Sequence, residues 1–259
     1  PGMLVAVVAR CPVFGGKVRS FNADLAMKVK GVEKVVQVGT GVAVVANGFW
    51  AAKKGRDALQ ITWDEGPLAK VSSPDLYKSW AELAKGSTAA ERLKVGDFGA
   101  ALASGAKRVD AVYEVPFLAH ACMEPMNTTA HFKGDSVEIW SPTQAQSWGQ
   151  HAVSQLTGLP TKAITLHTTY LGGGFGRRLE TDYVVEAVDV SRAAGNVPVK
   201  VVWTREDDIQ NAVYRPASLN VMQAALDANG ALTAWRHRIV GASILQYFKT
   251  FGHFLRKDG

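Results

Sequence analysis

Short apolar or alternating runs of strand length recur along the chain, separated by stretches in which apolar residues follow helical spacing. In the first part of the chain, the runs predicted as strands cover residues 4–10, 32–38, 41–46 and 60–63. They are rich in β-branched residues and have the length typical of strands. Helices are expected over residues 24–30, which Asn22 or Asp24 can cap and Gly31 stops, and over residues 49–59. This order predicts an α+β unit over residues 1–69.

The next stretch, residues 70–106, has a different pattern. It is rich in Ala, Lys and Glu, and Ser72–Asp75 is a helix start signal with Pro74 inside the first turn. Helices are predicted over residues 75–85 and 98–106. We interpret the stretch as a connecting arm between two folded units.

The last part of the chain, residues 107–259, again combines strands and helices. Its predicted strands cover residues 109–115, 128–132, 137–140, 163–170 and 197–204, and a hairpin joins 219–226 to 231–240. Helices are predicted over 143–156, with Thr143 as the cap, and over 181–194. The order of strand, helix and strand indicates βαβ units. The aromatic segment 246–254 is expected to serve packing.

Composition and charge narrow the functional classes. Hydrophobic residues make up 47% and charged residues 20% of the 259 residues, which is ordinary for a globular protein. The net charge is +6, but the basic residues are scattered, so no nucleic-acid partner is expected. No apolar run approaches the ~20 residues that a membrane helix needs. A zinc site or an iron–sulfur cluster needs about four ligands, so Cys11 and Cys122 are expected to be ordinary thiols, with a disulfide between them as the alternative.

A cluster of glycines stands between a predicted strand and a predicted helix. The candidate binding residues there are Gly172, Gly173, Gly174, Phe175, Gly176, Arg177 and Arg178. Glycines let backbone amides approach a ligand, a helix N-terminus favours an anion, and arginines suit phosphate. The loop lacks the Walker pattern, and G-x-G-x-x-G fails at Arg177. The pattern favours a site for a phosphorylated ligand, with a tight turn that binds nothing as the alternative.

This loop resembles the GGGFG-basic motif in the large subunits of xanthine-oxidase-type molybdenum hydroxylases. Other segments resemble the family in the same order, namely residues 2–4, 9–12, 41–46, 50–54, 63–67, 109–116, 119–125, 140–144 and 201–208. The resemblance covers nearly the whole chain. Within the family, the chain is most similar to isoquinoline 1-oxidoreductase β-subunits and membrane-associated aldehyde dehydrogenase subunits, and it is interpreted as a fragment of such a subunit.

The resemblance implies a fold and a cofactor. Residues 1–69 would form an α/β hammerhead-like domain, residues 70–106 the arm, and residues 107–259 the first part of a molybdopterin-binding domain. The cofactor implied is molybdopterin, in bacteria usually as the cytosine dinucleotide. The implied reaction places oxygen from water on an aldehyde or N-heteroaromatic carbon. Electrons would leave to a separate [2Fe–2S] subunit, with a membrane-associated cytochrome as one candidate acceptor.

The resemblance also assigns roles within the site. Residues 172–176 would line the pterin and the molybdenum with backbone amides, while Arg177 and Arg178 would either contact cofactor phosphate or cap the surface. His120 and Glu124 would flank the cleft, with structural roles as the stronger expectation. Gln144 and Gln146 either reach the cofactor or cap a helix.

Departures from the family pattern limit what this chain can do. Leu118 and Leu179 stand where xanthine oxidases have a glutamine and a glutamate, so a more apolar substrate than xanthine is expected. The C-terminal Gly-x-Gly-Glu motif, which supplies the catalytic base, does not occur, so the isolated chain is expected to be inactive. Two alternatives remain: a non-enzymatic binding or scaffold module derived from this family, and an unrelated enzyme that uses the loop for a phosphorylated ligand.

Overall fold

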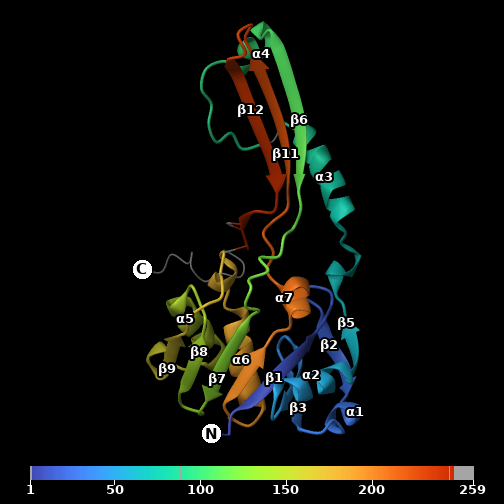
Figure 1. Ribbon diagram of the computed structural model, residues 1–259. Helices are drawn as coiled ribbons and strands as arrows, with labels where there is room; N and C mark the ends of the chain where they lie inside the picture. Colours follow the sequence, from blue (N-terminus) through green and yellow to red (C-terminus); the bar gives the residue numbers. More distant parts are fainter. Residues whose placement is uncertain (1, 88, 245, 248–259) are drawn as a thin grey trace. The chain divides into compact units, whose positions relative to one another are not determined.

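The computed structural model describes residues 2–87, 89–244 and 246–247 (Figure 1). The chain divides into two compact units, each built from two segments of sequence. The first unit contains the residues up to Lys70 together with Ala119–Val213, and the second contains Val71–Leu118 and the described residues from Tyr214 onward. The three consecutive domain ranges stay a prediction, and most of the aromatic segment 246–254 lies outside the described residues.

A seven-stranded mixed sheet forms the centre of the first unit. Its order is β3-β4-β1-β10-β7-β8-β9. The strands are β1 (Leu4–Arg10), β3 (Val32–Val38), β4 (Gly41–Ala46), β7 (Asn127–Phe132), β8 (Val137–Ser141), β9 (Ile164–Thr168) and β10 (Val199–Val202). β1 pairs in parallel with β10, Leu4 opposite Val199. Strands from the N-terminal segment and from the segment after residue 119 therefore share one sheet.

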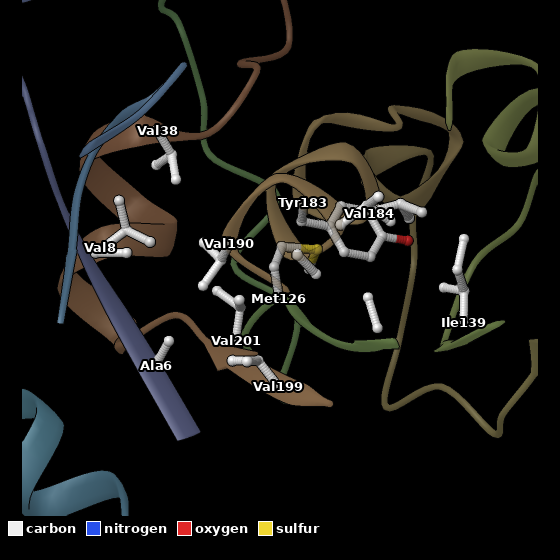
Figure 2. Packing of buried hydrophobic residues seen from close by; sticks show 14 of the residues in the cluster. Ala6, Val8, Val38, Met126, Ile139, Tyr183, Val184, Val190, Val199 and Val201 are labelled. Carbon is white, nitrogen blue, oxygen red and sulfur yellow. The ribbon is translucent and has the colours of Figure 1, made fainter. Parts of the chain in front are cut away.

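Helices cover both faces of this sheet. They are α1 (Asp24–Met27), α2 (Phe49–Asp57), α5 (Gln146–Thr157) and α6 (Asp182–Ala193). A further helix, α7 (Arg205–Asn211), follows β10 along the chain. Side chains from β1, β4, β10 and α6 form the main core, part of which Figure 2 shows. On the other face, Ala52 of α2 packs with Val7 and Ala46. Because both of its faces are covered, every residue of β4 is buried, which explains its continuous apolar run.

The structure confirms the α+β class and most predicted elements, with some differences. β8, α5 and β9 form the expected parallel crossover. The second expected βαβ unit, formed by β9, α6 and β10, has a different arrangement. β10 is parallel to β9, but β7 and β8 lie between these two strands in the sheet. The prediction missed β2 (Lys17–Asn22), which pairs with β5 (Gln60–Asp64), and it also missed α7.

The second unit is a three-stranded antiparallel sheet with helices packed against it. Its order is β12-β11-β6, from β6 (Lys107–Val115), β11 (Ser218–Leu226) and β12 (Leu232–Gly241). α3 (Ser73–Lys85) contacts β11 and β12, and α4 (Phe98–Ser104) contacts β12. Most of the stretch interpreted as an arm is therefore packed helix. Arg238 donates to carbonyls at the end of α3.

Short 3-10 helices lie between the other elements, at η1 (Pro67–Lys70), η2 (Thr161–Ala163) and η3 (Arg177–Leu179). Across the described residues, no helix has both the length and the apolar character needed to cross a bilayer. Cys11 and Cys122 are buried, and they form no disulfide with each other.

Candidate functional site

The glycine loop lies in the first unit, between the end of β9 and the start of α6 (Figure 1). Three of its residues have left-handed backbone conformations, with φ of 94° at Gly173, 52° at Phe175 and 94° at Gly176. L-residues rarely adopt positive φ, whereas glycine does so readily. The turn η3 follows directly, and the chain then enters α6. The loop therefore has a sharply folded backbone that depends on its glycines.

The loop backbone also lies very close to its neighbours. A Cβ atom added at Gly172 would stand 2.6 Å from Cβ of Glu124, and one at Gly174 would stand 2.5 Å from Oε1 of Gln144. Side chains at these two positions would force the neighbouring groups to move. Glycine is thus explained at four positions of the loop. Gly173 and Gly176 have positive φ, and Gly172 and Gly174 lie too close to neighbouring side chains to carry a Cβ.

Arg178 holds the beginning of the loop from inside the protein. Its side chain is fully buried and donates through Nε to the carbonyl of Gly173 at 2.7 Å and through Nη1 to Pro142 at 3.3 Å. Nη2 donates to both the carbonyl and Oε2 of Glu124, each at 2.8 Å. The same Oε2 accepts from the Gly172 amide at 2.8 Å. Glu124 therefore supports the loop backbone, with its side chain 34% exposed.

Arg177 holds the end of the loop in a second ion pair. Its buried guanidinium binds Asp182 through two parallel hydrogen bonds of 2.8 and 2.7 Å. It also lies over the rings of Trp203 and Tyr183. Burial alone would lower the pKa of Arg177, but the charge and hydrogen bonds of Asp182 raise it above its ordinary value. Both arginines thus take their acceptors from the protein itself.

Backbone amides are the donors that the loop leaves available. Within the described residues, no hydrogen bond is recorded from the amides of Gly173, Gly174 or Phe175, whereas the Gly176 amide donates to Gln144 at 3.2 Å. The side chain of Phe175 is 75% exposed and that of Tyr170 is fully exposed. The loop can therefore bind a planar group that carries hydrogen-bond acceptors. Arg177 Nε adds one buried donor that has no partner among the described residues.

The other predicted site residues lie near the loop with different roles. A Cβ at Gly176 would be 3.9 Å from Nε2 of the half-buried His120. Gln146 starts α5 and is exposed. The prediction of Thr143 as the helix cap was wrong, because Ala145 occupies that position and the Thr143 hydroxyl instead contacts Ala145 N and the Arg178 carbonyl.

Sequence reasoning missed two supporting groups. Asp182 was assigned no role, although an acidic residue five positions after Arg177 was a usable signal. The second group is the pair of Arg205 and the buried Asp208, 2.7 Å apart, in which Arg205 also donates to the Cys122 carbonyl. Burial raises the pKa of Asp208. Among the residues that the structure describes, no group of three or more His, Cys, Asp or Glu side chains could hold a metal ion.

Comparison with known proteins identifies the family. Residues 82–244 match the model of the molybdopterin cofactor-binding domain, and the chain belongs to this family. It is 30% identical, over 97% of its length, to isoquinoline 1-oxidoreductase subunit beta of Brevundimonas diminuta, covering 34% of that protein. It is 33% identical, over 85% of its length, to a membrane-bound aldehyde dehydrogenase [pyrroloquinoline-quinone] of Gluconacetobacter polyoxogenes, covering 30% of it.

Solved structures share the fold. The aldehyde oxidoreductase of Desulfovibrio gigas superposes with a TM-score of 0.70 at 17% identity, over 93% of this chain and 31% of that one. Quinoline 2-oxidoreductase of Pseudomonas putida 86 gives a TM-score of 0.66 at 21% identity, over 92% of this chain and 36% of that one. The present chain spans about a third of the length of the relatives that it matches.

Proposed function

We propose that this chain is part of the molybdopterin-binding subunit of a molybdenum hydroxylase that oxidises an aldehyde or an N-heteroaromatic compound with oxygen from water. The observation that carries the proposal is the glycine loop, in which the amides of Gly173, Gly174 and Phe175 have no hydrogen-bond partner among the described residues. The names of the two sequence relatives, an isoquinoline oxidoreductase subunit and an aldehyde dehydrogenase, support the substrate class.

The residues present fit such a cofactor. When bound, molybdopterin would supply the metal centre at which oxygen transfer and electron acceptance take place. The amides of residues 173–175 would donate to its oxygen acceptors, which stabilises partial negative charge without a titrating proton. The missing Cβ atoms at Gly172 and Gly174 let the loop backbone pack closely against Glu124 and Gln144. We propose the cytosine dinucleotide form, with Arg177 and Arg178 supporting the loop from behind; Arg177 Nε is a buried donor without a partner among the described residues.

The exposed side chains of the loop favour an apolar substrate. Phe175 is 75% exposed and Leu179 is 36% exposed, and neither presents a group that would bind a polar purine. The base glutamate and the rest of the cofactor pocket are proposed to lie in the remainder of the parent protein, so the isolated chain is inactive. Electrons are proposed to pass to a [2Fe–2S] subunit and from there to an acceptor such as a membrane-associated cytochrome.

A pair of matched variants tests the proposal in the full-length parent subunit, expressed with its partners. Gly173 and Gly134 have nearly equal φ, 94° and 93°, so alanine introduces similar backbone strain at both. Gly134 lies in the turn between β7 and β8 and has open space around it. Molybdenum per subunit, by elemental analysis, and pterin, by fluorescence after oxidation, are measured for Gly173→Ala and Gly134→Ala.

We expect Gly173→Ala to lower cofactor content and aldehyde or isoquinoline oxidation by about tenfold or more, since a displaced amide no longer meets its acceptor. Gly134→Ala should retain both. Equal cofactor content and activity in the two variants would refute the role of the loop. If the purified wild-type protein contains neither molybdenum nor pterin, the proposed enzymatic function is refuted and a scaffold module is favoured.

A further inference from the structure

The two arginines after the glycine loop share one arrangement. Each guanidinium is completely buried, while its carboxylate partner comes from outside the loop and is about one-third exposed: 34% for Glu124 and 33% for Asp182. A sequence pattern of glycines followed by arginines favours direct phosphate binding. In the structure, the arginine side chains point into the protein and are neutralised there.

Glu124 and Arg178 fix the first half of the loop. The Glu124 carboxylate accepts from the Gly172 amide, and the Glu124 amide donates to the Gly172 carbonyl at 3.2 Å. Arg178 connects this carboxylate to the Gly173 carbonyl. The three peptide groups that carry the amides of Gly172, Gly173 and Gly174 are therefore held by one connected set of hydrogen bonds.

Asp182 and Arg177 fix the second half. The Arg177 amide donates to the Gly174 carbonyl at 2.8 Å, which closes the turn containing Phe175. The bidentate pair with Asp182 holds Arg177 in place against Trp203. A bidentate arginine–carboxylate pair restricts orientation more than a single hydrogen bond does.

We propose that Glu124 and Asp182 are positioning residues that, through Arg178 and Arg177, set the directions of the loop amides. They touch neither cofactor nor substrate. Their consequence for catalysis rests on the proposed function, but their effect on the loop does not. The two carboxylates act on opposite halves of the loop, so each variant tests the inference separately.

The experiment compares Glu124→Gln and Asp182→Asn with Asp189→Asn in the full-length parent subunit. Asp189 is on α6 like Asp182 and also pairs with an arginine, Arg192, but that arginine is 42% exposed and the pair lies outside the loop's hydrogen bonds. Amide hydrogen exchange is followed by mass spectrometry on peptides spanning residues 170–182 in cofactor-free protein. Melting temperatures are recorded to confirm that each variant is folded.

Exchange of the loop peptide should accelerate about tenfold or more in Glu124→Gln and Asp182→Asn, because local opening no longer breaks a charged pair. Asp189→Asn should change it less than about twofold. In cofactor-loaded enzyme, kcat per molybdenum should fall by about tenfold with KM within twofold, since misplaced amides affect the reacting geometry more than substrate binding. The Mo(V) paramagnetic resonance signal should also shift.

Loop exchange equal to wild type in both variants would overturn the inference, whether or not the parent protein binds molybdopterin. Faster exchange with unchanged kcat and an unchanged Mo(V) signal would overturn the positioning role in catalysis. Faster exchange in the variants, together with a wild-type parent protein that binds no molybdopterin when it is expressed with its partners, would confirm the support of the loop and overturn the proposed function instead.

Discussion

Glu186 is the centre of a buried polar network in the first unit, and replacing it with glutamine gives the sharpest stability prediction. Its carboxylate accepts from Arg10 through Nε at 2.9 Å and through Nη2, from the Thr40 hydroxyl at 2.6 Å and from Trp203 Nε1 at 2.8 Å. The side chain of Glu186 has no exposed surface and that of Arg10 has 8%. The network joins β1 and the β3–β4 turn to α6.

The magnitude follows from what Glu186→Gln leaves behind. The glutamine amide has one acceptor oxygen where the Glu186 carboxylate has two for its four donors. Its NH2 group would face two of those donors and could not accept from them. Among the residues that the structure describes, Arg10 then retains only Asp207, at 3.8 Å, as a charged partner. Removing one member of a buried ion pair destabilises a protein by about 3–5 kcal/mol. Asp189 on the same helix pairs with Arg192, whose side chain is 42% exposed, and this pair should contribute only about 0–1 kcal/mol. Asp189→Asn keeps a side-chain oxygen as an acceptor for the Gly39 amide.

Urea denaturation of Glu186→Gln, Asp189→Asn, Arg10→Met and the Glu186→Gln/Arg10→Met double variant measures these values. Tryptophan fluorescence is a suitable signal, because Trp203 is part of the network. The double variant should lose less stability than the sum of the two single variants, by about 1 kcal/mol or more, since no unpaired charge stays buried. A loss below about 1 kcal/mol in Glu186→Gln, or additive single losses, would refute the reasoning.

Three further predictions follow from burial and backbone geometry. Gly55→Ala places a Cβ 2.8 Å from two valine side chains under α2 and should destabilise the protein by about 1–3 kcal/mol in urea denaturation. As the control, Gly99→Ala makes only ordinary contacts in α4 and should stabilise the protein by up to about 1 kcal/mol, because alanine favours a helix. Burial raises the pKa of Asp208, so between the unfolded-state pKa of about 4 and the higher native-state pKa the native protein binds more protons than the unfolded chain. The free energy of unfolding therefore falls as the pH rises through this range. Thermal melts at several pH values should show this loss in the wild type and not in Asp208→Asn. Burial also raises the pKa of the Cys122 thiol. In a Cys11→Ser background, Cys122 should react with a disulfide reagent at neutral pH about 100-fold more slowly in the folded protein than in guanidinium. Equal rates in the two conditions would contradict the structure.

Local sequence patterns predicted the elements of the fold better than their assembly. The continuous apolar run of β4 identified a strand because both of its faces are buried. β6 was identified by the alternation of apolar and charged residues in its sequence, although most of its residues are exposed. β2, with the sequence KVRSFN, is mostly exposed and pairs only with β5, so its pattern was too weak to detect. The pairing of β1 with β10 joins residues about 195 positions apart, and no local signal specifies it.

The candidate site shows a similar limit. Glycine composition correctly located the sharply folded loop, because positive φ and close backbone approach both select glycine. The supporting carboxylates come from different places: Asp182 lies five residues after Arg177, but Glu124 lies 54 residues before Arg178. Spacing could have suggested the first pair, whereas the second depends on the fold.

Arginine chemistry explains why the motif has two interpretations from sequence. A guanidinium presents five donors in a rigid fork, which suits phosphate oxygens and backbone carbonyls alike. Burial separates the two uses, because a ligand-binding fork must reach the ligand, whereas Arg178 uses Nε, Nη1 and Nη2 on acceptors of the chain itself. Burying such a charge is favourable only when acceptors satisfy it. The loop thus presents neutral, oriented amides instead of a mobile positive charge, and orientation is the property that catalytic positioning requires.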